Sequence, residues 1–328
     1  MSLELVATPI RWEMNEPFRI SRGEMTHVEG VVVELRDRAG HFGRGEAYGI
    51  AYEGETVESM LRQIDAARAP FLAAPDRAAL LHLLPVGGAR CALDCALWDL
   101  EAKRTGQRAW QRAGLATWRP LVSAYTIGMR PLAEIGAAVA PRARYPLLKI
   151  KVGADDPLAT VRAARAASPI ARLIVDANQS WTFERLREYA PACRDLGVAL
   201  LEQPVAADAD AALAGYDCPV PVCADEAVHV AADLAKVVGK YSVINIKLDK
   251  AGGLTAALEL AHAALSQGLR LMVGCMAGSS LAIAPAMVVG QLCDFVDLDG
   301  PLLQRSDWPN PIHYFNGRMS QPDAALWG

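Results

Sequence analysis

This chain of 328 residues lacks several features that assign proteins to common classes. Its seven cysteines form no Cys-x-x-Cys pair, and an odd number of scattered cysteines indicates reduced, buried thiols in a cytoplasmic protein. A net charge of −4 without a basic stripe argues against nucleic acid as a partner. Residues 1–4 show neither the basic region nor the apolar run of a signal peptide, so we expect no targeting segment there.

Histidine is also scarce, and none of the six stands beside an acid at the end of a predicted strand, so we expect no catalytic histidine. The longest stretch without a charged residue, 271–293, is interrupted by several glycines and by Pro285. It therefore predicts a strand, a loop and a buried helix, and we expect no membrane partner. The oligomeric state stays open, and a homo-oligomer is compatible with the sequence.

A repeat of short apolar runs and alanine-rich helical stretches begins near residue 121, with a period of about 25 residues. Alternation of this kind is typical of parallel strands joined by helices, and eight runs predict an α/β fold of the (β/α)8-type barrel. The expected strands are 121–127, 147–151, 173–176, 198–202, 220–224, 243–247, 270–274 and 295–298, and the clearest helices are 157–167, 182–196 and 254–267.

The first part of the chain has a different pattern, which predicts an α+β capping domain over residues 1–118. Residues 3–12 and 30–36 alternate like antiparallel strands, and 16–27 is expected to be a polar loop between them. Helices are expected at 56–66, 76–84 and 89–104. We assign the barrel domain to 119–300, and we expect the C-terminal segment 301–328 to return to the capping domain.

Three acids, Asp176, Glu202 and Asp225, each follow an apolar run, at intervals of about one strand-loop-helix unit. A single acid after a strand is often a helix cap, but three in register on successive parallel strands converge on one point of a barrel. Carboxylate oxygens with open positions for water and substrate are the ligands that Mg²⁺ prefers. We therefore expect these three acids to bind Mg²⁺.

Lysines flank the three acids at the ends of other strands. Lys149 and Lys151 lie two residues apart on one strand, so both side chains are expected to face the barrel interior. Lys149 is expected in an ion pair with a barrel acid, where it supports the site electrostatically. Lys151 and Lys247 lie four strands apart, and two amines on opposite sides of a substrate carbon suit removal and return of a proton.

Two further features are candidates for substrate binding. Asp297 and Asp299 share a face at the end of the eighth expected strand, and two inward acids need a cation such as a substrate ammonium, unless they are loop or cap residues. Arg22 lies between Ser21 and Gly23 in the expected polar loop. An exposed loop arginine is usually only solvated, but Arg22 could bind a substrate carboxylate if the loop closes over the barrel.

With these residues, the sequence resembles the enolase superfamily in its muconate-lactonizing subgroup, and most closely the dipeptide epimerases. The matching motifs cover nearly the whole chain and are Lys149-Ile-Lys151, Asp176-Ala-Asn178, Leu201-Glu-Gln-Pro204, Ala224-Asp-Glu226, Asn245-Ile-Lys247 with Lys250 to Gly253, and Asp297-Leu-Asp-Gly-Pro301. A segment of the expected third helix, Ala92 to Leu100, also fits.

The resemblance implies a specific reaction and roles for the residues. Asp176, Glu202 and Asp225 would bind Mg²⁺, with Asn178 and Glu226 supporting them, and Lys151 and Lys247 would be two bases. They would invert the α-carbon of the C-terminal residue of an L,L-dipeptide, L-Ala-L-Glu to L-Ala-D-Glu, by 1,1-proton transfer through an enediolate. Asp297 and Asp299 would hold the dipeptide ammonium. The implied setting is cytoplasmic recycling of cell-wall peptides.

Other functions stay open at this point. The same metal and lysines serve o-succinylbenzoate synthase, N-acylamino-acid racemase and cycloisomerase reactions, whose substrates leave Asp297 and Asp299 without an ammonium. A non-catalytic barrel protein is a more remote alternative, because all five metal and base residues are present. The sequence departs from close relatives at Tyr48 to Glu55, where an arginine of the second cap loop is missing. That loop helps to select the substrate side chain.

Overall fold

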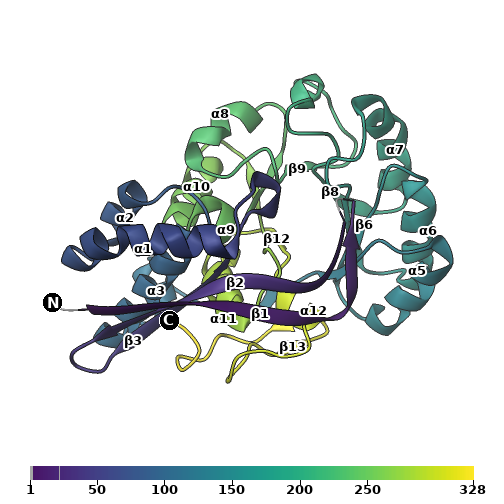
Figure 1. Ribbon diagram of the computed structural model, residues 1–328. Coiled ribbons are helices and arrows are strands. Elements are labelled where there is room, and N and C mark those ends of the chain that lie inside the picture. The colour runs from purple at the N-terminus through teal and green to yellow at the C-terminus, as the bar shows by residue number, and fades with distance from the viewer. Residues whose placement is uncertain (1–2, 22) are drawn as a thin grey trace.

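The computed structural model describes residues 3–21 and 23–328, which form a capping unit and a barrel (Figure 1). The barrel is one sheet of eight parallel strands in the order β12-β11-β10-β9-β8-β7-β6-β5. Its strands are β5 (Tyr125–Ile127), β6 (Leu147–Lys151), β7 (Arg172–Asp176), β8 (Val198–Glu202), β9 (Val222–Ala224), β10 (Val243–Ile246), β11 (Arg270–Val273) and β12 (Phe295–Val296). The prediction of a (β/α)8-type barrel with an α+β cap is confirmed.

Helices lie outside the barrel and link its strands (Figure 1). Side-chain caps mark where several of them begin: Asp156 accepts a hydrogen bond from Ala159 N, and Thr182 accepts one from Arg185 N. The helices are α5 (Leu132–Val139), α6 (Pro157–Ala167), α7 (Phe183–Asp195), α8 (Leu234–Val237), α9 (Leu248–Ala251), α10 (Leu254–Ser266), α11 (Ser280–Gly290) and α12 (Gly300–Leu303), with short 3₁₀ turns at Ala140–Arg142, Asp210–Leu213 and Ala231–Asp233.

The barrel interior has an apolar layer below a polar one, because alternate residues of a strand face the same side. The apolar layer takes one residue from each strand or its start: Ala124, Leu147, Ile174, Leu200, Cys223, Val243, Met272 and Phe295. Two residues further along the same strands come Thr126, Lys149, Asp176, Glu202, Asp225, Asn245, Gly274 and Asp297. The spacing of two therefore carries the charged groups to the C-terminal end of the barrel.

The first barrel strand differs from the prediction. The expected strand 121–127 is broken into β4 (Leu121–Val122) and β5, and β4 pairs antiparallel with β14 (Arg318–Met319), which also pairs with β13 (Tyr314–Phe315). Ala124 N donates to Val296 O at 2.8 Å, which brings the chain before β5 against β12 and closes the ring. Because of this break, residue 121 pairs in a small outer sheet and residue 125 pairs in the barrel sheet.

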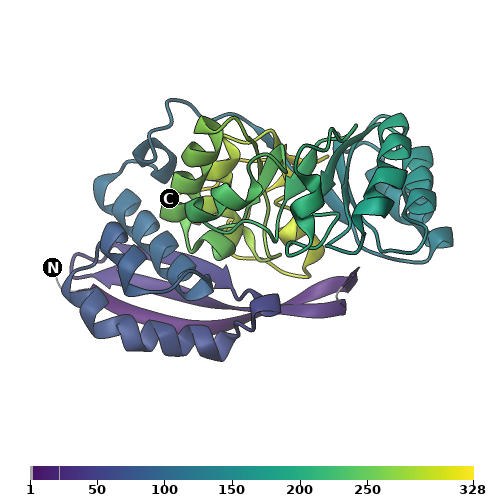
Figure 2. The same cartoon turned by 90° about the horizontal axis from the view of Figure 1, so that it is seen from above.

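The capping unit contains a longer hairpin than predicted. Strands β1 (Leu3–Ile20) and β2 (Gly23–Asp37) pair almost to their common tip, so the prediction of a polar loop over 16–27 was wrong. The polar side chains there belong to a two-stranded ribbon that extends beyond the cap and along the barrel (Figures 1 and 2). Strand β3 (Phe42–Tyr48), which we did not predict, completes the sheet beside β2.

Helix α3 (Gly88–Thr105) lies between the cap sheet and the barrel (Figure 2) and is buried over most of its length. From it, Arg90 donates to Gly252 O at 3.1 Å and Asp94 accepts from Thr255 N at 2.9 Å. Burial raises the pKa of Asp94 to about 6 despite these contacts with Thr255. The other cap helices are α1 (Val57–Ala73), α2 (Arg77–Leu83) and α4 (Ala109–Arg112), with a short 3₁₀ turn at Ala51–Glu53.

The end of the chain contacts the capping unit (Figure 1). Trp327 is buried and donates from Nε1 to Cys95 O at 3.1 Å, and Gly328 N donates to Asp99 Oδ1 at 2.6 Å. Arg44 Nη2 donates to Ala325 O at 2.8 Å. These contacts support our proposed division into residues 1–118, 119–300 and a C-terminal segment 301–328.

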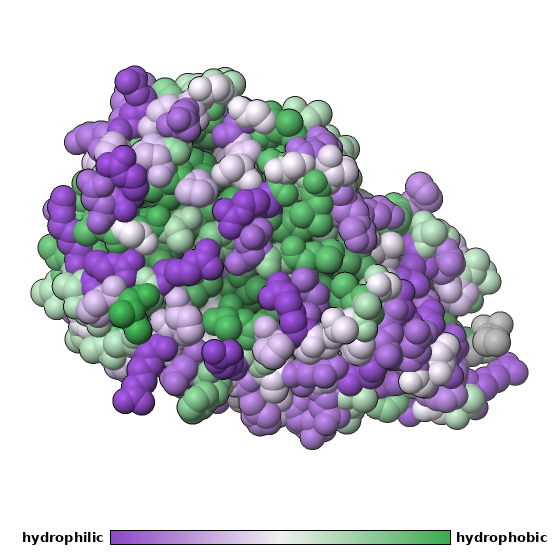
Figure 3. All heavy atoms as spheres, turned by 180° about the vertical axis from the view of Figure 1, so that it is seen from behind, coloured by the Kyte–Doolittle hydropathy of each residue, from purple (hydrophilic) through white to green (hydrophobic). Residues whose placement is uncertain are grey.

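The stretch 271–293 contains most of strand β11, a loop and then α11, which is buried along most of its length. Among the described residues, no helix combines the length and apolar character needed to cross a bilayer. Figure 3 shows one face of the molecule, on which hydrophilic side chains are densest over the cap.

We predict that Trp327→Ala lowers the free energy of unfolding by about 3–5 kcal/mol, because a large buried side chain is removed from the contact with α3. Trp327→Phe is the matched control: it keeps most of the packing, loses one hydrogen bond and should cost about 1 kcal/mol. Urea unfolding measures both values. A loss below about 1 kcal/mol for Trp327→Ala would contradict the role of the C-terminal segment in anchoring the cap.

Candidate active site

The three predicted acids lie side by side at the C-terminal ends of β7, β8 and β9. Asp176 is directly opposite Glu202 in the sheet register, and Asp225 follows the last residue of β9. All three side chains are buried. Because a buried carboxylate is stable only beside a cation or hydrogen-bond donors, their partners decide what the site can do.

Lys149 lies at the centre of the barrel mouth and contacts three acids. Its Nζ lies 3.0 Å from Asp176 Oδ2, 2.8 Å from Glu202 Oε2 and 2.7 Å from Asp297 Oδ2. Burial opposes the charge on Lys149, but these acids outweigh burial and raise the pKa of the ammonium well above its ordinary value. Lys149, which we expected in an ion pair with one barrel acid, is thus an ammonium held by three acids.

The two predicted bases each contact a different acid. Lys151 Nζ donates to Asp176 Oδ2 at 2.6 Å and to Asn178 Oδ1 at 3.0 Å. Lys247 Nζ donates to Asp225 Oδ2 at 2.8 Å. Lys151 ends β6 and Lys247 follows β10, four strands away in the sheet, so the two amines approach the acids from opposite sides of the barrel mouth.

The pKa values follow these contacts. Burial alone would raise the pKa of Asp176, but Lys151 and Lys149 outweigh it and hold the pKa below its usual value. For Glu202 the nearby lysines do not outweigh burial. Burial and the neighbouring charge of Asp176 raise its pKa to about 7. Burial opposes charge on Lys247, but Asp225 outweighs it and raises the pKa of the ammonium.

The donor set suits a hard divalent cation. Glu202 Oε2 lies near Lys149, yet within the described part of the chain it makes no hydrogen bond of acceptable geometry. A buried carboxylate oxygen without such a bond is suited to a metal ion. Lysine ammoniums lie against these carboxylates in the structure. Among the described residues, no group of three or more acidic, histidine or cysteine side chains is already arranged to hold a metal ion.

The acid pair after β12 lies beside the first barrel strand. Thr126 N donates to Asp299 Oδ2 at 2.6 Å, and Thr126 Oγ1 donates to Asp297 Oδ1 at 3.3 Å. Burial and the charge of Asp297 raise the pKa of Asp299 to about 7. Asp297 already has Lys149 as its cation, whereas no ion pair of Asp299 occurs among the described residues.

A cavity of about 430 Å³ lies above these groups, and the three lysines, Asp297 and Asp299 line its floor. Its upper wall comes from the hairpin, including Phe18, Ile20 and Met25, and from Tyr52 of the second cap loop. Ser21 Oγ donates to Asn178 O at 3.2 Å, so the hairpin tip contacts the barrel mouth. Arg22, the predicted carboxylate-binding residue, lies outside the described residues.

Of the two predicted supporting residues, Asn178 contacts the site directly. Its N–H donates to Asp176 Oδ1 at 2.9 Å while its side chain accepts from Lys151. Asn178 Nδ2 also approaches Glu226 Oε1 at 3.5 Å. The structure therefore groups all the predicted site residues that it describes around one barrel mouth.

Three site residues were missed from the sequence: Gln203, Asn245 and Lys250. Gln203 Oε1 accepts from Asp225 N at 2.8 Å, and Asn245 Nδ2 donates to Glu202 Oε1 at 2.9 Å. Lys250 is buried and donates to Asp225 Oδ1 at 2.6 Å. All three residues lie within the motifs that carry the resemblance, and the alternation of inward residues also points to Asn245, which precedes Lys247 by two.

Comparisons with known proteins identify the family of this chain. Residues 2–114 match the family described as mandelate racemase / muconate lactonizing enzyme, N-terminal domain, and residues 133–325 match the enolase C-terminal domain-like family. An L-Ala-D/L-Glu epimerase from Escherichia coli is 40% identical over 312 residues, which are 94% of this chain and 96% of that protein. An N-acetyl-D-glutamate racemase from a Pseudoalteromonas species is 38% identical over 91% of this chain and 95% of that protein.

A solved structure is also similar to this chain. It is an enolase family member from Agrobacterium tumefaciens with homology to dipeptide epimerases, crystallised with sodium and L-Ala-L-Glu. It superposes with a TM-score of 0.96 at 43% identity and covers 99% of this chain and 100% of its own.

We predict that Glu202→Gln and Asp225→Asn each weaken Mg²⁺ binding at least tenfold, about 1.4 kcal/mol, because each removes a carboxylate charge from the donor set. Isothermal titration calorimetry measures the dissociation constant, and Asp195→Asn, at an exposed position, is the control that should bind as the wild type does. Circular dichroism shows whether each variant is folded. Wild-type affinity in both folded site variants would contradict the assignment.

Proposed function

Because this chain belongs to the enolase superfamily, with the domains of the mandelate racemase and muconate lactonizing enzyme group, we propose that it is a dipeptide epimerase. It inverts the α-carbon of the C-terminal residue of an L,L-dipeptide and is thus an isomerase acting on amino-acid derivatives. The observation that supports this best is the pair of lysines, Lys151 and Lys247, which approach one cavity from opposite sides and each contact a predicted metal-binding acid.

The two lysines would transfer the proton. In this structure each amine is bound to a carboxylate, so it must leave that carboxylate and lose its own proton before it can accept the substrate's α-proton. One lysine then removes the proton from one face of the carbon, and the other, still an ammonium, donates a proton to the opposite face. Lys149 stays charged between three acids and stabilises negative charge on the substrate carboxylate.

Asp176, Glu202 and Asp225 would hold Mg²⁺, the ion found in complexes of other dipeptide epimerases. When bound, Mg²⁺ supplies positive charge that stabilises the enediolate form of the substrate carboxylate. Asn178 and Glu226 would support these ligands from the adjoining loops. Gln203 and Lys250 hold Asp225 by hydrogen bonds to its backbone and carboxylate.

The proposed substrate is L-Ala-L-Glu. Asp297 and Asp299 would bind its ammonium, and the raised pKa of Asp299 supports this, because a cation is what that buried acid lacks. Arg22 would bind the glutamate carboxylate. The second cap loop lacks the arginine of close relatives, and Tyr52 there contacts His229 instead, with 3.3 Å between the hydroxyl oxygen and Nε2. This loop could make the side-chain pocket tolerant of other residues.

The physiological setting that we propose is recycling of cell-wall peptides in the cytoplasm. The similarity to L-Ala-D/L-Glu epimerase supports it, because the name of that relative gives the dipeptide that we propose as the substrate here. The seven cysteines, all free thiols in this structure, are consistent with a reducing compartment.

A second candidate function is racemisation of an N-acylamino acid. The similarity to N-acetyl-D-glutamate racemase favours it, since an acylated substrate has no ammonium. The pairing of Asp297 with Lys149 also reduces the negative charge available to an ammonium. The two functions share the metal and the lysines and differ only at Asp297 and Asp299.

We predict that Lys151→Ala and Lys247→Ala each reduce epimerisation of L-Ala-L-Glu on the order of a thousandfold, because each substitution removes the acid-base group from one face of the α-carbon. Mass spectrometry in D₂O with Mg²⁺ should still detect α-proton exchange, of one diastereomer in one variant and of the other in the second. Lys236→Ala, at an exposed lysine, should behave as the wild type. Epimerisation at the wild-type rate by either site variant would refute the two-base assignment.

We also predict that Asp299→Asn lowers kcat/KM for L-Ala-L-Glu by ten- to a hundredfold, because a charge-assisted hydrogen bond contributes about 1.5–3 kcal/mol. N-acetyl-L-Ala-L-Glu should be a poor substrate of the wild type and should be little affected by the substitution. Steady-state kinetics with both compounds measures this difference. Equal turnover of free and acetylated dipeptide would favour the N-acylamino-acid racemase.

A further inference from the structure

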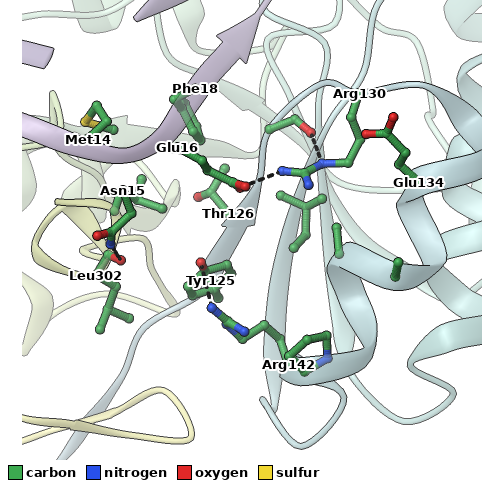
Figure 4. A pocket seen from close by; sticks show the side chains of 16 residues that line it. Met14, Asn15, Glu16, Phe18, Tyr125, Thr126, Arg130, Glu134, Arg142 and Leu302 are labelled. Atoms are coloured by element: carbon green, nitrogen blue, oxygen red, sulfur yellow. Dashed lines mark hydrogen bonds and ion pairs between the residues drawn. The ribbon is translucent and has the colours of Figure 1, made fainter. Parts of the chain in front are cut away.

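A second cavity, of about 560 Å³, adjoins the candidate active site. It lies between the irregular part of β1, the strand β5 and helices α5 and α12 (Figure 4). Its volume is within the range of roughly 300–1,000 Å³ that is usual for small-molecule pockets. None of the proposed metal ligands or bases lines it, so it needs a separate explanation.

The two cavities share part of their walls. Phe18, Thr126 and Leu303 line both. Thr126 also forms the hydrogen bonds to Asp297 and Asp299, through its hydroxyl and its N–H. A group held by these two acids therefore lies one residue away from the second cavity.

Most polar groups of the second cavity already have partners within the protein (Figure 4). The exception is Glu134, an exposed residue whose carboxylate has no such partner among the described residues. Arg130 Nη2 donates to Glu16 Oε1 at 2.9 Å, and Arg142 Nη2 donates to the Tyr125 hydroxyl at 3.1 Å with its guanidinium over the ring. Asn15 Nδ2 donates to Leu302 O at 3.1 Å. Because these three groups are paired and the charge of Glu134 is screened by solvent, an ionic ligand gains little here.

The remaining surface is apolar and comes from both units of the protein. Met14 and Ile127 are buried and line the cavity together with Ala138, Pro141 and Leu302. Paired polar groups around an apolar lining suit an uncharged side chain, whose binding is driven by burial of apolar surface.

We propose that the second cavity is a substrate subsite for the side chain of the dipeptide's N-terminal residue. It accepts an uncharged side chain larger than the methyl group of alanine, such as that of methionine or leucine. This inference rests on the proposed function: an ammonium at Asp297 and Asp299 places the N-terminal α-carbon beside Thr126, and the side chain branches from that carbon. The protein then acts on a broader set of dipeptides than L-Ala-L-Glu.

Substitutions on α5 test the subsite. Ala138 lines the cavity and is half-buried, so Ala138→Phe fills the space, and Ala137→Phe does so from an exposed position on the same wall. The wild type should turn over L-Met-L-Glu and L-Leu-L-Glu with kcat/KM no lower than that for L-Ala-L-Glu. In both filled variants the ratio of kcat/KM for L-Met-L-Glu to that for L-Ala-L-Glu should fall at least tenfold. Ala133→Phe, exposed on the same helix and outside the cavity, should leave the ratio unchanged.

The outcomes separate the subsite from the function on which it rests. Wild-type turnover of L-Ala-L-Glu with an unchanged ratio in both folded filled variants would overturn the subsite and leave the epimerase standing. Turnover of Gly-L-Ala-L-Glu that is lost in Ala138→Phe would overturn it too, since the cavity would then hold an N-terminal extension. Absence of α-proton exchange for every dipeptide with the wild type would overturn both.

Discussion

Buried carboxylates need cations, and this need organises the C-terminal end of the barrel. Five acids face four lysines there: Asp176, Glu202, Asp225, Asp297 and Asp299 against Lys149, Lys151, Lys247 and Lys250. The excess of negative charge is one unit. Burial and the charge of a neighbouring carboxylate together raise the pKa of Glu202 and of Asp299 to about 7. These are the two acids beside which a metal ion and a substrate ammonium would add positive charge.

The same ion pairs hold the two proposed bases against carboxylates. Lys151 and Lys247 are held by the acids that would bind the metal, so occupation of those acids by another cation would release the amines. Lys149 has three acid partners and would keep its charge when one partner is engaged elsewhere. Lys149 thus differs in its proposed role from Lys151 and Lys247 because it has three acid partners and each of those two has one.

The cap completes the site from the other side. Glu46 of β3 is buried and accepts from Ser279 N at 3.1 Å, Ser279 Oγ at 2.6 Å and Trp308 Nε1 at 2.6 Å. It thereby fixes the start of α11, whose preceding loop lines the cavity through Met276 and Ala277. Gly274, just before that loop, has no side chain to collide with Asn245 and Lys247, which leaves Lys247 free to enter the cavity.

Much of this arrangement could be predicted from the sequence because strand geometry is local. The alternation of inward residues and the shared edge of parallel strands bring together Lys149, Asp176 and Glu202 without knowledge of the loops. What could not be predicted depends on distant contacts. The polar ends of β1 and β2 are extended because they form a two-stranded ribbon along the barrel. The contact of Lys250 with Asp225, which gives this motif residue its role, is evident only from the structure.

A divalent cation at the three acids would replace the lysine ammoniums there and so free two opposed bases. A crystal structure with Mg²⁺ and L-Ala-L-Glu would show whether it does. We expect the ion on Asp176, Glu202 and Asp225, with the glutamate α-carbon between the Nζ atoms of Lys151 and Lys247. An ion bound elsewhere, or both amines on the same face of that carbon, would contradict this expectation.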